Sequence, residues 1–374
     1  MLPIQMVDLQ RQYQPIKEEI LSGIEAVLDQ AAFINGKPVQ EFSNALAQYL
    51  DAKHVIPCAN GTDALQIAMM ALDLQPGDEV ITPSFTYIAT TEVVALLRLK
   101  PVFVEVDRNT FCMDPESVRK AITPKTKAIV PVHLYGQAAP MDEIMQIAQE
   151  HNLYVIEDNA QAIGGTYTSK DGSVKKTGTI GHIGCTSFFP SKNLGGYGDG
   201  GAISTNDDAL ADKMRMIANH GQSKRYYHDV VGCNSRLDTI QAVVLNAKLK
   251  RLDQYIAARR NAADYYDAAF AQHPAIQTPQ RAAYAGHVFH QYTLILHGVD
   301  RDGLNAHLAA HQIPSMIYYP VPGHRQKMFD SFGLPQYNLE TTDWLTERVI
   351  SLPMHTELDE EQLAYITQKV LSYI

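Results

Sequence analysis

One lysine stands at the start of a glycine-rich turn. Lys192 follows residues 187–191, which include two serines, and five glycines fall within residues 195–201. Glycine lets the backbone adopt positive φ angles and approach a ligand closely. The P-loop pattern of a glycine, four residues and Gly-Lys-Ser/Thr is absent. The available chemistry is that of a lysine amine, which can form a Schiff base with a carbonyl compound or with pyridoxal phosphate. A lysine in a flexible surface loop is the simpler alternative.

An aspartate ends one of the apolar runs. Asp158 closes the run 154–158 and lies 34 residues before Lys192, so both can reach one pocket through an intervening hairpin. In a pyridoxal phosphate enzyme a carboxylate pairs with the pyridinium nitrogen, so that the ring can accept the electrons of a carbanion. An aspartate at the end of a strand can also simply cap the next helix.

Two further features could complete a cofactor site. Gly61 and Thr62 stand where a strand turns into a helix, and the N–H groups of a helix N-terminus beside a hydroxyl suit a phosphate. Tyr87 follows another strand, where an aromatic ring can stack on a flat cofactor. Their ordinary alternatives are a helix cap and core packing.

Alternating strands and helices must position these residues. Short apolar runs at 54–58, 79–83, 101–106, 128–134 and 154–158 alternate with helical patterns at 64–72, 87–99, 114–122 and 141–151. This alternation predicts an α/β fold with a mostly parallel sheet covered on both faces. Ligands of such sheets bind at the carboxyl ends of the strands, and residues 60–63, 84–87, 133–136 and 158–161 all fall there.

The flanking segments predict a second, smaller domain. Helices are expected at 14–29 and 39–50, and a strand and a helix follow the lysine turn at 202–205 and 207–219. A long helix from 237 that runs on to 270 would bridge to the second domain, where strand, helix and strand are expected at 291–296, 301–311 and 314–319. We therefore divide the chain into a large domain, 1–250, and a small α+β domain, 251–374.

Composition narrows the class of protein. At 374 residues the chain exceeds the usual size of a single core, and 45% hydrophobic and 19% charged residues are ordinary for a globular protein. There is no membrane-length apolar run, no signal peptide and no metal-ligand spacing among the four cysteines, which are expected to be reduced in the cytoplasm. A net charge of −10 without a basic run argues against nucleic acid or membrane as a partner.

The sequence as a whole resembles the DegT/DnrJ/StrS family of sugar-nucleotide aminotransferases. The motifs that carry the resemblance are CANGTDAL at 58–65, PGDEVITPSFTYIAT at 76–90, IEDNAQAIG at 156–164, TSFFPSKNLGGYGDGGAI at 186–203 and NSRLDTIQA at 234–242. The resemblance implies a pyridoxal phosphate enzyme of the aspartate-aminotransferase-like fold, fold type I, and it covers nearly the whole chain.

The resemblance also implies roles for individual residues. Lys192 would hold the cofactor covalently, and Asp158 would pair with the pyridinium nitrogen. Gln161 would lie near the ring hydroxyl and Tyr87 would stack on the ring. The phosphate would be bound by Gly61, Thr62 and Ser187, and by Asn234 of a neighbouring subunit, so that the active form is at least a homodimer. Asn159 departs from the alanine usual in the family, which is expected to change only the packing behind the site.

The implied reaction has two halves. An amino acid, most simply glutamate, gives its amino group to the cofactor and leaves as 2-oxoglutarate, and a keto sugar on a nucleotide diphosphate then receives the group. The amine of Lys192, once free, would be the general base, a role that suits a lysine whose pKa is lowered by burial.

A basic and aromatic segment is the candidate for binding the sugar nucleotide. Residues 220–228 contain Arg225 and His228 and would offer charge-assisted donors to a diphosphate, unless they form a solvated loop. Arg236 offers a fork suited to a carboxylate, although a salt bridge to Asp238 or another acidic residue is an equal alternative. Further candidates for lining the substrate site come from the second domain: Tyr318, Tyr319 and His355.

Within the family, the chain looks similar to the 3-aminotransferases of UDP-2-acetamido-2-deoxy-3-keto-hexuronic acid, which make precursors of surface polysaccharide. The alternatives are a 3-aminotransferase for a dTDP-3-keto-6-deoxyhexose and a 4-aminotransferase for a UDP-4-keto sugar. A regulatory homologue without activity is the alternative from another class, and the presence of Lys192, Asp158 and Gln161 speaks against it.

Overall fold

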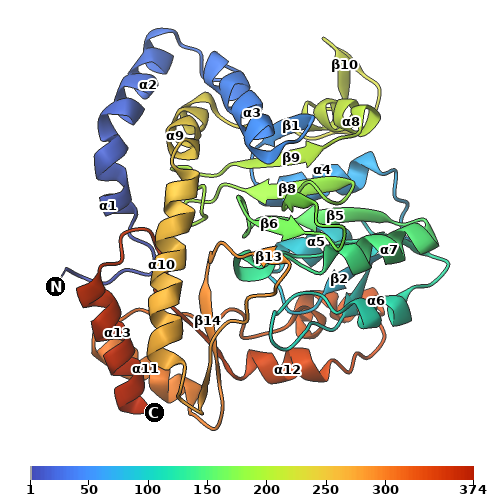
Figure 1. The fold of residues 1–374 in the computed structure, drawn as a ribbon. Coiled ribbons are helices and arrows are strands. Elements are labelled where there is room, and N and C mark those ends of the chain that lie inside the picture. Colours follow the sequence, from blue (N-terminus) through green and yellow to red (C-terminus); the bar gives the residue numbers. More distant parts are fainter. Residues whose placement is uncertain (1) are drawn as a thin grey trace.

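A seven-stranded sheet forms the centre of the large part of the molecule in this computed structural model, which describes residues 2–374 (Figure 1). The strand order is β1-β9-β8-β5-β4-β2-β3. The strands are β1 (His54–Cys58), β2 (Glu79–Pro83), β3 (Lys100–Val104), β4 (Thr126–Ile129), β5 (Tyr154–Asp158), β8 (Ile183–Ser187) and β9 (Gly201–Thr205). β3, β2, β4, β5 and β8 run parallel, whereas β9 is antiparallel to both β8 and β1. The strands that precede the predicted site residues therefore end at one edge of the sheet.

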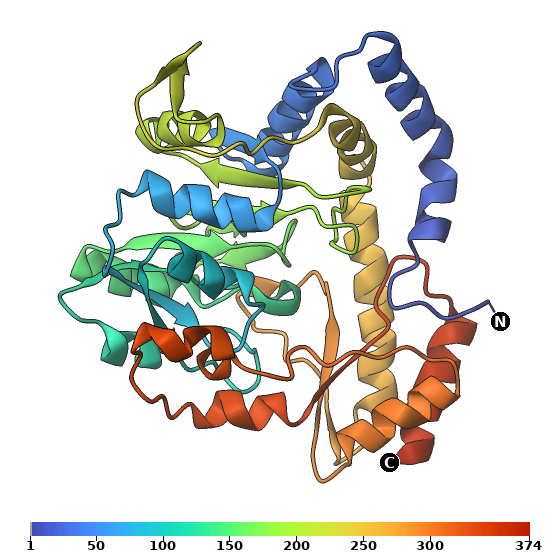
Figure 2. The ribbon, with the colours of Figure 1, turned by 180° about the vertical axis from the view of Figure 1, so that it is seen from behind.

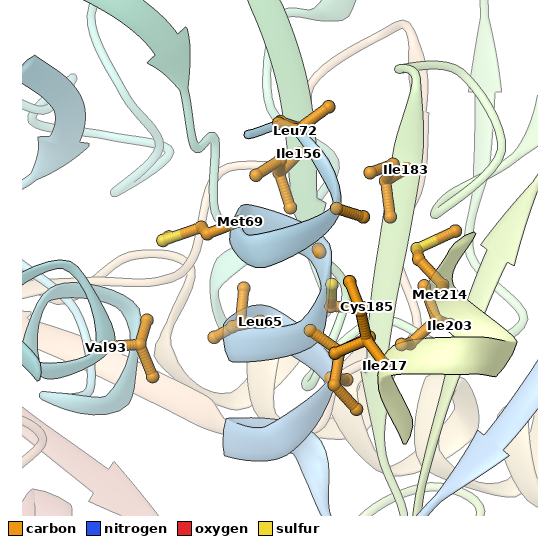
Figure 3. Packing of buried hydrophobic residues seen from close by; sticks show 14 of the residues in the cluster. Leu65, Met69, Leu72, Val93, Ile156, Ile183, Cys185, Ile203, Met214 and Ile217 are labelled. Carbon is orange, nitrogen blue, oxygen red and sulfur yellow. The ribbon is translucent and has the colours of Figure 1, made fainter. Parts of the chain in front are cut away.

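Helices cover both faces of this sheet. The helices of the large part are α3 (Lys37–Leu50), α4 (Gly61–Ala71), α5 (Ala89–Leu96), α6 (Pro115–Ala121), α7 (Met141–His151), α8 (Asp208–Ala218) and α9 (Thr239–Leu249). Successive strand residues point to opposite faces, so that Ile56, Ile156 and Ile203 pack with α4, α5 and α8 in one core cluster (Figure 3). Their neighbours Val55 and Val155 belong to clusters on the other face, with α3 and α9 and with α6 and α7.

A second core lies at the other end of the long helix α10 (Leu252–Phe270). It contains the three-stranded sheet β12-β14-β15, formed by β12 (Ile276–Gln277), β14 (Tyr292–Leu296) and β15 (Val349–Leu352), together with α11 (Arg301–Ala310) and α13 (Glu360–Tyr373). Figure 2 shows this assembly beside both chain ends. However, α12 (Glu340–Thr346) and the residues before it pack against the large part. Phe329 and Leu339, which precede α12, contact Phe103 of β3. The division at residue 250 falls between α9 and α10 and stays a prediction.

The remaining elements are short or peripheral. They are α1 (Leu9–Tyr13), α2 (Lys17–Asp29), the strands β6 (Thr166–Thr168), β7 (Val174–Lys176), β10 (Gln222–Lys224), β11 (Tyr227–His228) and β13 (Ala285–Gly286), and four 3₁₀ turns at Gln14–Ile16, Leu134–Gly136, Gly323–Arg325 and Lys327–Phe332. β6 and β7 form the hairpin expected between Asp158 and Lys192. No helix within residues 2–374 is long and apolar enough to cross a membrane. The four cysteines are unpaired.

Four sequence-based element assignments were wrong. The helix expected from 237 to 270 is two helices, because α9 ends at Leu249 and α10 begins at Leu252. The strand expected at 314–319 is a single bridge between Met316 and Ser351. The helix expected at 14–29 begins with a 3₁₀ turn at Gln14–Ile16 and becomes α-helical only at Lys17. The strand expected at 128–134 ends at Ile129.

Candidate active site

Lys192 lies on the turn that leaves β8 at the carboxyl edge of the sheet. Its backbone N–H donates to the carbonyl of Phe189 at 2.8 Å, and the N–H of Gly196 donates to Phe188 at 2.8 Å, which closes the turn. A Cβ on Gly195 would lie 2.2 Å from the carbonyl oxygen of Pro190, so this fold of the turn requires glycine there. Burial lowers the pKa of the Lys192 amine to about 8, against the opposing effect of the Asp158 carboxylate. The amine therefore exchanges its proton close to neutral pH.

Asp158 ends β5 and is buried. Its Oδ2 accepts a hydrogen bond from the Thr90 hydroxyl at 2.7 Å, and its Oδ1 accepts from the backbone N–H of Ala160 at 3.1 Å. Burial raises the pKa of this carboxyl group, and the two hydrogen bonds, Lys192 and His133 oppose that effect. Each oxygen keeps a lone pair for another donor, because a carboxylate oxygen can accept two. The carboxylate is thus fixed in orientation and still able to bind a cationic N–H.

A phosphate-sized group of donors lies at the start of α4. Asn60 caps this helix by accepting from the N–H of Asp63 at 2.8 Å. Among the described residues, no acceptor faces the N–H groups of Gly61 and Thr62. A Cβ on Gly61 would lie 2.7 Å from Cβ of Ser187, so the helix end and the end of β8 are in close contact only because residue 61 is glycine. These residues remain partly exposed, which leaves the donors open to an anion.

Aromatic and amide side chains wall the space beside Asp158. The amide of Gln161 is held at both ends, since its Oε1 accepts from the N–H of Tyr135 at 2.7 Å and its Nε2 donates to the Tyr319 hydroxyl at 3.0 Å. The rings of Tyr87 and Tyr319 lie 6.2 Å apart with a 45° tilt. Tyr87 is 57% exposed, so one face of its ring is free for a planar partner.

Buried polar groups behind the site hold its strands in place. His133 and Glu157 are fully buried, with Nε2 and Oε2 2.7 Å apart. The Glu157 carboxylate also accepts from the backbone N–H groups of Gly178, Ile180 and Gly181 at 2.6–2.8 Å. The Asn159 amide donates to the Thr177 carbonyl at 3.2 Å and contacts the Thr186 hydroxyl at 3.3 Å. Asn159 thus contributes to the packing behind the site.

The residues predicted for the sugar nucleotide lie elsewhere in the chain. Arg225 and His228 are exposed on the β10–β11 hairpin, where the Arg225 guanidinium contacts its neighbour Tyr226. Asn234 is exposed near the base of that hairpin, bridged to Asn219. Arg236 lines a separate surface pocket and forms no salt bridge with Asp238 or any other acidic residue among the described residues, so that alternative from the sequence was wrong. Within one chain these side chains do not join Lys192.

The second-domain candidates divide into two groups. The Tyr319 hydroxyl lies at the site, where it accepts a hydrogen bond from the Gln161 amide. The backbone carbonyl of Tyr318 accepts a hydrogen bond from the Tyr135 hydroxyl. His355 is instead buried, and burial together with the nearby Arg259 lowers its pKa to about 4. This placement does not favour a role in lining the substrate site, and the role stays a prediction. The sequence reasoning missed Thr90, although it lies inside the motif at 76–90.

These groups fit pyridoxal phosphate by their chemistry. The site combines an amine with a pKa near neutrality, a buried carboxylate with spare acceptor capacity and an open set of backbone donors at a helix start. Together they match the aldehyde, the ring nitrogen and the phosphate of that cofactor. The bound cofactor would supply the ability to stabilise negative charge at the carbon that exchanges its proton.

Comparison with known proteins decides the family. The sequence profile described as DegT/DnrJ/EryC1/StrS aminotransferase family matches residues 14–371. The chain belongs to this aminotransferase family. Accordingly, it is a pyridoxal phosphate-dependent aminotransferase of fold type I.

Two curated family members are similar over almost their full length. UDP-N-acetyl-3-dehydro-α-D-glucosamine 3-aminotransferase of Acidithiobacillus ferrooxidans is 48% identical, with 97% of this chain and 96% of the relative covered. UDP-2-acetamido-2-deoxy-3-oxo-D-glucuronate aminotransferase of Pseudomonas aeruginosa is 46% identical, with 97% and 98% covered.

Solved structures of family members share the fold. A DegT/DnrJ/EryC1/StrS aminotransferase from Brucella abortus superposes with a TM-score of 0.94 at 40% identity, covering 99% of both chains. NtdA from Bacillus subtilis, solved with bound cofactor PMP, superposes with a TM-score of 0.88 at 30% identity, covering 98% of this chain and 83% of the other. The sequence-based expectation of fold and cofactor is therefore confirmed.

The residues of the site can each be assigned a role in the aminotransferase reaction. We assign Lys192 as the group that holds the cofactor and, when free, moves the proton of the substrate carbon. Asp158, which Thr90 fixes in orientation, would hold a proton on the ring nitrogen through its charge. Gly61, Thr62 and Ser187 would bind the phosphate, and Tyr87 and Gln161 would orient the ring. These assignments are our proposal for the site.

Proposed function

We propose that the protein transfers an amino group from glutamate to C3 of a UDP-linked 2-acetamido-2-deoxy-3-keto sugar, with the 3-keto-glucuronic acid as the substrate. The observation that carries the reaction type is the pairing of a low-pKa lysine with a buried, oriented aspartate at one sheet edge. The near-equal similarity to relatives named for the glucosamine and glucuronate substrates supports C3 of a UDP-linked sugar as the position.

Arg236 supports the carboxylated sugar. Its guanidinium is partly exposed and lines a surface pocket of about 420 Å³ that also contains Asn35, Gln40 and Arg215. Among the described residues it has no ion-pair partner. The planar guanidinium of an arginine can bind a carboxylate or a phosphate through two parallel hydrogen bonds. Arg236 is therefore the best candidate to bind the sugar carboxylate.

We propose that the active form is a homodimer with shared sites. Asn234 is exposed and Arg236 is partly exposed, and neither side chain contacts Lys192 of the same chain. In a two-fold dimer the segment of the partner that carries these two residues can complete the site, because the symmetry places each subunit's segment at the other subunit's site. We further place this enzyme in the cytoplasm, where its amino-sugar product would serve surface polysaccharide synthesis.

A substrate panel tests the proposal. The 3-keto sugars are generated in the assay by a dehydrogenase from UDP-2-acetamido-2-deoxyglucuronic acid and from UDP-N-acetylglucosamine, with glutamate as donor. We expect a kcat/KM for the glucuronic acid at least about 10-fold higher, the range of one charge-assisted contact. Equal turnover of both would contradict a preference for the carboxylated sugar, and faster turnover of the glucosamine would favour that sugar as the substrate. Turnover of only dTDP-3-keto or UDP-4-keto sugars would contradict C3 of a UDP sugar.

A variant of Arg236 distinguishes loss of carboxylate binding from a general loss of substrate binding. Arg236→Ala is expected to raise KM for the carboxylated sugar about 10-fold or more and to leave the uncharged sugar unchanged. Arg225→Ala, on the exposed β10–β11 hairpin, is the control for diphosphate binding and should raise both KM values alike. An unchanged KM in Arg236→Ala would exclude this residue as the carboxylate partner.

A further inference from the structure

A second side chain faces the reacting nitrogen of Lys192. Nε2 of His290 lies 3.4 Å from Nζ of Lys192, although the two residues are 98 positions apart. His290 belongs to the loop just before β14 and is 4% exposed. Asn193, the residue after the lysine, ties the same loop down by donating from its amide to the carbonyl of Val288 at 2.9 Å. The contact is therefore held from both chain segments.

The surroundings fix which nitrogen of His290 carries the proton. The Nε2 atom faces two donors, the Lys192 amine and the amide nitrogen of Gln291, both at 3.4 Å. Two donors are satisfied only by a lone pair, so Nε2 is unprotonated and Nδ1 carries the hydrogen. Nδ1 is buried without a partner among the described residues. The ring thus presents an acceptor, and only an acceptor, to the lysine.

His290 is also kept from taking the proton itself. Burial, the Lys192 ammonium and the Arg259 guanidinium all lower the pKa of His290 far below its usual value. Arg259 comes from α10 and donates to the backbone carbonyls of Phe289, His290 and Met354 at 2.9–3.3 Å. The other charge that faces Lys192 is the Asp158 carboxylate at the end of β5. A ring in this setting stays neutral while the lysine changes its protonation state.

We propose that His290 is a positioning residue that holds the free amine of Lys192 through one N–H and so directs its lone pair at the substrate carbon. A neutral lysine amine has two N–H bonds and one lone pair, so fixing one N–H restricts where the lone pair points. The proton that moves is carried by Lys192 throughout, and His290 neither gains nor loses one. This inference rests on the proposed role of Lys192 as the base.

Labelling of the apoenzyme tests the contact without any turnover. The rate at which acetic anhydride modifies Lys192, followed by peptide mass spectrometry against pH, reports the pKa of its amine. We expect a midpoint near pH 8 in the wild type, and a midpoint about one unit lower in His290→Phe, because the ammonium loses its acceptor but not its burial. His290→Gln, which keeps an acceptor, should restore at least half of the shift. The same midpoint in His290→Phe and the wild type would overturn the proposal.

A second histidine of the same loop provides the matched control. His287 is buried, stacks on Phe289 at 3.9 Å between ring centroids and accepts from the backbone N–H of that residue at 2.9 Å, with no contact to Lys192. His287→Phe disturbs the loop but not the amine, so its midpoint should equal that of the wild type. A shift as large as that in His290→Phe would show that the effect is one of loop packing and would also overturn the proposal.

The glutamate half-reaction tests the consequence for catalysis. In single turnovers of the loaded enzyme, His290→Phe should release 2-oxoglutarate about 10- to 100-fold more slowly, with an unchanged half-saturating glutamate concentration and a larger isotope effect with [2-²H]glutamate. An unchanged rate and isotope effect would overturn the proposal. If the wild type itself releases no 2-oxoglutarate, the proposed donor is wrong, and the labelling experiment alone decides the role of His290.

Discussion

Two lysines near the glycine-rich turn share the same lowered pKa. Burial lowers the pKa of both Lys192 and Lys248 to about 8. Lys192 faces the Asp158 carboxylate and the His290 acceptor, whereas Lys248 lies over the ring of Tyr197 at 4.7 Å and close to the cation of Arg259. A lowered pKa alone therefore does not mark the catalytic lysine. What distinguishes Lys192 is a carboxylate and an acceptor that control its proton at an open sheet edge.

The largest expected effect separates the two lysines by activity. Lys192→Ala should lower amino transfer by about 10⁴-fold, because it removes both the covalent attachment and the base. Lys248→Met should leave kcat within about twofold, since a buried residue away from the reacting atoms acts mainly on stability. Steady-state assays of both purified variants make the comparison. Comparable losses in both would show that the lowered pKa, rather than the partners, is what the reaction needs.

Removal of the Asp158 charge should come next. Asp158→Asn keeps only one acceptor oxygen, enough for either Thr90 or Ala160, and removes the negative charge, and kcat should fall about 10²- to 10³-fold. The same change should lower the pKa of Lys192 below 8, because the carboxylate raises it, and leave Lys248 as it is. Labelling of both lysines against pH measures this difference. A Lys192 midpoint that stays in place would mean that Asp158 does not control its proton.

The third prediction concerns stability rather than activity. Between pH 8 and 10.5 the unfolded chain binds more protons than the native one, because the pKa of both lysines is lowered in the native state. Each lysine therefore destabilises the native state fully below pH 8, and this destabilisation shrinks as the pH rises toward 10.5. Lys248→Met removes a penalty of about 3 kcal/mol and a cation–π contact of about 1 kcal/mol.

Urea unfolding of the apoenzyme measures this effect. We expect Lys248→Met to be more stable than the wild type by about 2 kcal/mol at pH 7, with the difference shrinking toward pH 10. A variant that is less stable at pH 7 would show that Lys248 has an anionic partner in solution.

The smallest predicted effect sharpens the description of the aspartate. Thr90→Val removes one hydrogen bond to Oδ2 of Asp158 at nearly constant volume. A hydrogen bond to a charged group contributes about 1.5–3 kcal/mol, so the affinity for pyridoxal phosphate should fall about 10- to 100-fold, still less than with Asp158→Asn. Absorbance titration of the apoenzyme with the cofactor measures it. Equal affinities would mean that Ala160 alone orients the carboxylate.

The cofactor half of the site could be predicted from the sequence because local rules determine it. A parallel sheet brings the ends of its strands to one edge, so residues at 60–62, 87 and 158 had to meet. The motif around Lys192 then indicated the chemistry. Residues on the hairpin and at Arg236 stay predictions, because their place in a site depends on a second chain that one sequence does not position.

The errors arose where tertiary contacts override local preference. Lys250 and Arg251 are good helix formers, yet the helix breaks there, and both side chains pair with Glu19 of α2. Residues 314–319 have strand-like composition, but Tyr319 packs on Gln161 and Tyr87 of the large part instead of pairing with β15. His290 gave no signal, because only the folded chain brings a residue 98 positions away to Lys192.

The central claim is that Lys192, and not Lys248, holds the cofactor and performs the transfer. Borohydride makes a reversible link between a lysine amine and pyridoxal phosphate permanent, and peptide mass spectrometry then locates it. The account predicts the added mass on Lys192 alone, with none on Lys248. Added mass on Lys248, or on no lysine at all in protein that has bound the cofactor, would contradict it.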